Sequence, residues 1–113
     1  MATIGRKRVV LSNEFQLDIK KVFIYGRITF GFNAVKTFVS EIYMLVWNLD
    51  YQYLMFPEVR FLTTKNKTYR NIILGSYLII YRIELDRVDV LRIFHSSQCT
   101  PQNISTVKRI KPI

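Results

Sequence analysis

The sequence has little of the residue types on which metal and redox sites commonly depend. In 113 residues it contains one cysteine, Cys99, and one histidine, His95. A single cysteine excludes an intrachain disulfide and a zinc site built from a cysteine cluster. The sequence therefore predicts no metal and no cofactor, and it favours a reducing compartment.

Long apolar runs and glycine-rich loops are missing as well. The longest strongly apolar stretch, residues 72–81, is interrupted at residues 75–76 and is about half as long as a membrane span. Residues 9–11 are too short for the core of a signal peptide. The glycines are dispersed and form no loop that would cradle a phosphate. We therefore expect a cytoplasmic protein with no membrane partner.

Acidic residues are scarce, whereas basic and apolar residues are abundant. Eight Asp and Glu face seventeen Lys and Arg, which gives a formal net charge of +9. This charge exceeds what a small domain needs for solubility, so it predicts an anionic partner such as nucleic acid, a ribosome or an acidic protein. A basic surface without a dedicated ligand is the alternative. With 50% apolar residues, the chain is expected to form one folded domain over residues 1–113.

The N-terminal third predicts a short strand followed by a helix. Residues 6–11 alternate as a strand would. Ser12 and Asn13 offer oxygens that can cap a helix, and Gln16 stands at capping-box distance from Asn13. Apolar residues then recur at helical spacing, so we expect a helix that ends near Gly26. These apolar residues are Phe15, Ile19, Val22 and Phe23.

A second helix is expected to open after Gly31, with Asn33 as its cap, and Pro57 excludes helix beyond it. One apolar face runs through about four turns. It comprises Val35, Phe38, Val39, Ile42, Val46 and Leu49. The short break between the helices favours an antiparallel hairpin packed on a sheet. The helical spacing of Tyr43 and Trp47 favours a place in the core beneath it, with the anchoring of a partner as the alternative.

Three apolar runs in the second half predict an antiparallel meander. They span residues 69–74, 77–85 and 88–94, and two-residue breaks separate them. After Cys99 the pattern weakens to a turn at residues 101–103 and a short basic end, which we expect to be mobile.

This order of elements, with these residues, resembles the RelE/ParE superfamily of toxins from type II toxin–antitoxin systems. The resemblance covers about residues 7–98 and leaves a basic C-terminal tail at 99–113. The strand with Tyr81-Arg82 and the strand that carries Arg92 and His95 are similar to the ParE and plasmid-stabilisation branch. The resemblance implies an α+β fold, in which an N-terminal strand, a helical hairpin and a three-stranded meander form a twisted sheet covered by helices on one face. It also implies a cognate acidic antitoxin.

Two activities are known in this superfamily. RelE-like members cleave messenger RNA on the ribosome, with cationic side chains at positions that map onto Arg70, Ile72 and Leu78. Two of the three positions are aliphatic in this chain. Because losing one such cation typically costs about 3–4 kcal/mol of transition-state stabilisation, this departure argues against RelE-type catalysis.

The endonuclease remains the alternative, with Arg70, Arg82 and His95 as its catalytic residues. Histidine suits a general acid at neutral pH. A histidine at this position also occurs in ParE-like members with no known nuclease chemistry, so a structural role stays open. Strand alternation places Arg70 with Ile72 on one face, and Arg82 with Leu78 on a face of the next strand.

ParE-like members act by binding, and the resemblance implies DNA gyrase as the target. A degenerate member that binds only the antitoxin is a third reading. Charge and aromatic character select candidate partner-binding residues. These candidates are Tyr51, Tyr53, Arg87, Arg92, Lys108 and Arg109.

Overall fold

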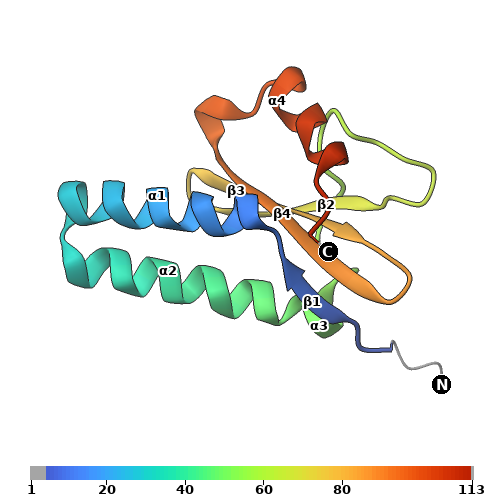
Figure 1. Ribbon diagram of the computed structural model, residues 1–113, viewed down its shortest axis with the longest axis horizontal. Coiled ribbons are helices and arrows are strands. Elements are labelled where there is room, and N and C mark those ends of the chain that lie inside the picture. The colour runs from blue at the N-terminus through green and yellow to red at the C-terminus, as the bar shows by residue number, and fades with distance from the viewer. Residues whose placement is uncertain (1–4, 113) are drawn as a thin grey trace.

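A four-stranded sheet forms the centre of the computed structural model, which describes residues 5–112 (Figure 1). The strand order is β1-β4-β3-β2. β1 (Arg8–Leu11) pairs in parallel with β4 (Arg87–His95). β3 (Tyr77–Ile83) runs antiparallel to both β4 and β2 (Tyr69–Leu74). The predicted α+β fold and its antiparallel meander are confirmed.

The helical hairpin consists of α1 (Asn13–Phe30) and α2 (Phe32–Trp47), followed by the short α3 (Leu49–Gln52). The Ser12 side chain caps α1 by accepting a hydrogen bond from the backbone of Phe15. Figure 1 shows α1 and α2 running side by side and reaching beyond the sheet. None of the helices between residues 5 and 112 is long and apolar enough to cross a membrane.

Two expectations about the hairpin turn were wrong. α1 does not end near Gly26 but continues to Phe30, because a glycine inside a helix costs only about 1 kcal/mol. Gly26 instead permits close packing of the two helices, since a Cβ there would lie 2.5 Å from Cγ2 of Val35. Asn33 is no cap, because Gly31 at φ 94° separates the helices and α2 begins directly after it.

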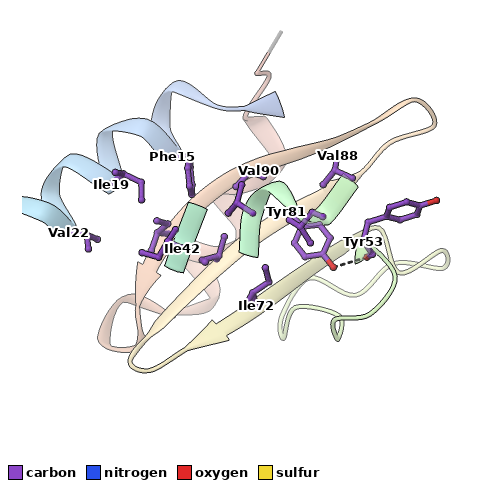
Figure 2. Close-up of a cluster of buried hydrophobic side chains, with 13 residues drawn as sticks. Phe15, Ile19, Val22, Ile42, Tyr53, Ile72, Tyr81, Val88 and Val90 are labelled. Atoms are coloured by element: carbon purple, nitrogen blue, oxygen red, sulfur yellow. Dashed lines mark hydrogen bonds between the residues drawn. The ribbon is translucent and has the colours of Figure 1, made fainter. Parts of the chain in front are cut away.

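The larger core lies between the hairpin and one face of the sheet. Phe15 and Ile19 of α1 and Ile42 of α2 pack against strand residues that include Val90 and Ile72 (Figure 2). The other buried members are Val22, Val46, Leu49, Tyr53, Ile79, Tyr81, Val88 and Ile93. The predicted apolar face of the second helix is therefore confirmed.

Two aromatic residues differ from expectation in their exposure to solvent. Tyr53, expected on a partner surface, is 7% exposed, and its carbonyl oxygen accepts a 2.8 Å hydrogen bond from the Tyr81 hydroxyl (Figure 2). Burial raises the pKa of Tyr81, which keeps that donor protonated. Trp47, expected in the core, is 50% exposed. It follows the buried Val46 by one residue, which turns its side chain about 100° away around the helix.

The opposite face of the sheet is covered by the C-terminal segment, residues 100–112. This segment contains α4 (Pro101–Ser105) and the 3₁₀ turn η2 (Thr106–Arg109), after the short η1 (Ser96–Gln98). Three apolar residues spaced by three anchor it in a second core with sheet and loop residues. The buried members of this core are Val59, Leu62, Ile80, Leu91, Phe94, Ile104, Val107 and Ile110. The expectation of a mobile end was therefore wrong, and helical turns cover both faces of the sheet.

A β-bulge in β4 changes which side chains face the hairpin. Ile80 of β3 lies opposite Arg92, whereas its neighbour Tyr81 lies opposite Val90, so Leu91 is the extra residue. Val90 and Ile93 consequently both pack under the hairpin although they stand three positions apart. A regular strand would place them on opposite faces.

We predict that the C-terminal segment contributes measurably to stability. Ile104→Ala should lower the free energy of unfolding by about 2–5 kcal/mol, because it leaves a cavity in the second core. Urea denaturation followed by circular dichroism measures this change. Lys108→Ala, on the exposed side of the same segment, should leave the free energy nearly unchanged. Equal effects of the two substitutions would contradict a packed segment.

Candidate functional site

Arg70 holds the connection between α3 and β2. Its guanidinium donates hydrogen bonds to the backbone carbonyls of Leu54 and Phe56, both at 3.0 Å, and to that of Lys67 at 3.1 Å. The side chain lies on the same face of edge strand β2 as Ile72, the face toward the hairpin. Its Nε and Nη1 donors are thus bonded to the chain's own backbone.

Arg82 is buried on the other face, under the C-terminal segment. Its Nη2 lies 2.9 Å from Oδ2 of Asp89 and donates to the carbonyl oxygen of Ile110 at 2.9 Å. Its Nε is in ion-pair contact with Glu84 at 2.9 Å, outside hydrogen-bond geometry. The guanidinium therefore ties three segments together: β3, β4 and the C-terminal segment.

Asp89 is fully buried and forms an ion pair with a second arginine, Arg87. Nε of Arg87 lies 2.8 Å from its Oδ1, so each carboxylate oxygen has a guanidinium partner. Arg87 also pairs with Asp86. The hydrogen bond and charge of Asp89 outweigh desolvation and raise the pKa of Arg87.

His95 ends β4 and caps the turn that follows. Its Nδ1 accepts the backbone N–H of Ser97 at 3.1 Å, so the neutral ring carries its proton on Nε2. Its backbone N–H donates to the side chain of Gln98. The ring also stacks edge-to-face on Tyr77 at a centroid distance of 5.3 Å. These contacts give His95 a structural role at the end of β4.

A polar hollow of about 380 Å³ lies beside His95. Arg92 lines it, held by Asp18 of α1 through two contacts of 2.7 and 3.0 Å. Lys21 of α1 and Tyr77 also line the hollow. Burial and the neighbouring Tyr25 raise the pKa of Tyr77, so its hydroxyl stays protonated and is no general base at neutral pH.

The three residues named for the endonuclease do not meet. In the β2–β3 pairing Arg70 lies opposite Tyr81, whereas Arg82 lies opposite Tyr69, so the two guanidiniums leave opposite faces of the sheet. His95 pairs with Tyr77, which is five residues from Arg82 along β3, or about 16 Å. Arg70, Arg82 and His95 therefore share no point at which one phosphate would contact all three.

A second, apolar hollow of about 310 Å³ opens between the two helices of the hairpin. Gly26, Phe30 and Ala34 line it, and Tyr25 and Tyr77 line both this hollow and the polar one. The two hollows thus adjoin. Together they give a surface that is apolar toward the hairpin end and polar beside β4.

Only a weak signal in the sequence points to this surface. Tyr25 lines both hollows and is more than half exposed, as are Ile24 and Ile28 on the same helix. They fall outside the apolar stripe of Phe15 and Ile19, and a helix with one buried face has no structural need for them. Within residues 5–112 no three metal-ligating side chains gather at one place.

The buried Asp89 should matter for stability far more than its exposed neighbour. Asp89→Asn removes the charge that compensates the buried guanidinium of Arg82, so we expect the free energy of unfolding to fall by about 3 kcal/mol. Chemical denaturation at neutral pH measures it. Asp86→Asn, which breaks only exposed ion pairs, should have little effect. A small loss for Asp89→Asn would show that Arg82 does not depend on this partner.

Comparison with known proteins places this geometry in a family. The family model described as "ParE toxin of type II toxin-antitoxin system, parDE" matches residues 9–99. No curated protein matches at a significant level. Among solved structures, the chain is similar to one in the chromosomal ParDE TA system from P. aeruginosa, with a TM-score of 0.67 and 14% identity, over 80% of this chain and 96% of that one.

A second similar structure is the toxin–antitoxin complex RelBE2 (Rv2865-2866) from Mycobacterium tuberculosis. The TM-score is 0.59 at 15% identity, over 84% of this chain and 97% of that one. At such identities the structures establish a shared fold. Because the family match extends over most of the sequence, the chain belongs to the ParE toxin family of type II toxin–antitoxin systems, within the RelE/ParE superfamily.

Proposed function

We propose that this toxin acts by binding a protein, with DNA gyrase as the target, and that it thereby inhibits bacterial growth in the cytoplasm. A cognate acidic antitoxin neutralises it. The observation that carries the proposal is the separation of Arg70, Arg82 and His95, since a binding toxin needs no catalytic set.

The endonuclease alternative lacks support from the arginines. Cleavage of RNA needs a base, an acid and cations within reach of one phosphate. Arg70 is bonded to three carbonyls, and Arg82 is buried beneath the C-terminal segment and paired with Asp89. Arg82 would have to give up its partners before it met a substrate, and two of the three nitrogens of the Arg70 guanidinium are already bonded. His95 alone faces an accessible hollow.

The adjoining hollows suit a segment of the acidic antitoxin. An apolar side chain of the antitoxin fits the hollow between the helices, and acidic side chains on the same segment would face Lys21, Arg92 and His95. The net charge of +9 favours such a partner and speeds its association. The two solved structures similar in fold come from toxin–antitoxin systems.

The target is proposed to contact a stripe along α2 and α3. Met44 and Trp47 of α2 and Tyr51 of α3 follow one another at helical spacing, and each is more than two fifths exposed. The exposed Met55 follows in the turn beyond α3. Arg6 stands over the Tyr51 ring at 5.2 Å. Trp, Tyr and Arg dominate binding hot spots, so this stripe has the composition of a protein-binding surface.

Toxicity should survive the loss of His95. The chain is induced without antitoxin while DNA and protein synthesis are pulse-labelled separately. Both the wild type and His95→Asn should stop DNA synthesis first and leave ribosome-bound message intact. Trp47→Ala should fold but lose most of the growth inhibition, because it removes the centre of the proposed stripe. Cut message with the wild type, together with a harmless His95→Asn variant, would instead establish the endonuclease.

Filling the apolar hollow should separate neutralisation from toxicity. Ala34→Trp places a large side chain in the hollow from an exposed position on α2, so the antitoxin segment can no longer bind there. Cells that express both proteins should then stop growing, whereas Ala34→Ser should still be neutralised. Co-purification with a tagged antitoxin measures the loss of binding directly. Full neutralisation of Ala34→Trp would place the antitoxin elsewhere.

A further inference from the structure

Two segments lie side by side on the sheet face opposite the hairpin. One is the loop between α3 and β2, of which Val59 and Leu62 are buried. The other is the C-terminal segment, anchored by Ile104, Val107 and Ile110 in the same core. Figure 1 shows this segment in red beside the yellow-green loop. Their outer sides therefore form one continuous surface.

Exposed cations dominate that surface. Each segment anchors itself in the second core through buried apolar residues and leaves its basic residues in solvent. The exposed cations are Arg60, Lys65, Lys67, Lys108, Arg109 and Lys111. Within the part of the chain that the structure describes, the ion pairs all involve other arginines. These six charges are thus available to an external anion.

Phe61 stands among these cations in an unusual conformation. Its φ is +72°, a region that a bulky aromatic residue rarely occupies, and its side chain is 48% exposed. Arg60 stacks over the ring with its guanidinium carbon 4.9 Å from the centroid. The buried residues on either side, Val59 and Leu62, hold the backbone in place. A strained residue that keeps an apolar ring in water points to a function for that ring.

The loop that carries Phe61 is internally braced. Glu58 accepts the backbone N–H of Thr64 at 2.9 Å, and the Thr64 hydroxyl accepts that of Thr68 at 2.9 Å. Lys67, also at positive φ, donates its backbone N–H to Thr64. The ring and the cations are therefore presented on an ordered scaffold.

We propose that this surface binds single-stranded nucleic acid. The cations would contact phosphates, and Phe61 would stack on an unpaired base. A duplex hides its base faces, whereas a single strand offers unpaired bases to Phe61 and phosphates to the cations, so it uses both features. The C-terminal half of the surface lies beyond residues 9–99, the part that matches the ParE family, so this property goes beyond the toxin activity proposed above.

Fluorescence anisotropy of the full chain with labelled oligo(dT) and oligo(rU) of about 12 nucleotides tests the proposal. Phe61→Asn should weaken binding about fivefold or more because the stacking ring is lost. Asparagine tolerates positive φ, so the variant should unfold at the same or a higher temperature. The matched control is Phe32→Asn, which removes an exposed ring that stacks on Lys36 at the hairpin.

The charges are tested separately. The triple variant Lys108→Gln, Arg109→Gln, Lys111→Gln should bind more weakly and reduce the slope of log affinity against log salt by about 2. A control triple variant, Lys20→Gln, Arg27→Gln, Lys36→Gln, removes the same charge from the hairpin and should retain the slope. A preference for dT over rU, or the reverse, identifies the natural strand.

Three results would overturn the proposal. Equal weakening by the two triple variants would reduce the binding to general charge attraction. Binding of a duplex as tight as that of a single strand and indifferent to Phe61→Asn would remove the stacking role. Polyglutamate that displaces the oligonucleotides at lower charge concentration would instead make an acidic protein the partner.

Discussion

The carboxylate of Asp89 is the constraint on which the sheet and its outer cover depend. A buried charge is tolerated only when it is paired and hydrogen-bonded, and Asp89 meets this condition through Arg82 and Arg87. Arg82 in turn donates to the carbonyl of Ile110 and thereby fixes the C-terminal segment on the sheet. Arg82, which the sequence suggests as a catalytic arginine, thus has a structural role: it holds the C-terminal segment against one face of the sheet.

A similar arrangement organises the hairpin side. Asp18 of α1 holds Arg92 and also accepts the backbone N–H of Ile93 at 2.9 Å, next to the bulge in β4. The bulge leaves one residue of β4 without a partner in β3, and Asp18 accepts the backbone N–H of Ile93 close to it. The helix and the irregular strand therefore fix each other's position, and the polar hollow beside His95 keeps its shape.

Much of this fold could be predicted from local patterns, because helix and strand periodicity depend on neighbouring residues. The hairpin, its apolar face and the turn at Gly75 followed from such patterns. The exposure of Trp47 and the burial of Tyr53 did not, since both residues are aromatic and only the phase of the helix and its exact end separate them. The order in the C-terminal segment was missed because three apolar residues in a basic stretch give too weak a signal.

The candidate site could be predicted less well than the fold, for a physical reason. A sequence shows which residues are cationic, but not which of them already have a partner. Asp18 and Arg92 are 74 residues apart, and no local pattern links them. The structure divides the cations into those that hold the fold together, such as Arg82 and Arg92, and those that face solvent.

Two of the surfaces that carry solvent-facing cations lie on opposite faces of the sheet. Lys21 belongs to the hairpin surface, and Lys65 and Lys108 belong to the surface around Phe61. The sheet and both cores lie between them, so one anionic partner on the hairpin would not cover the other surface. The bound anionic partner would, however, lower the net positive charge of the toxin and so weaken its long-range attraction for a second anion. An antitoxin at the hairpin would therefore reduce the affinity of the far surface for nucleic acid without touching it, and increasingly so as the salt concentration falls.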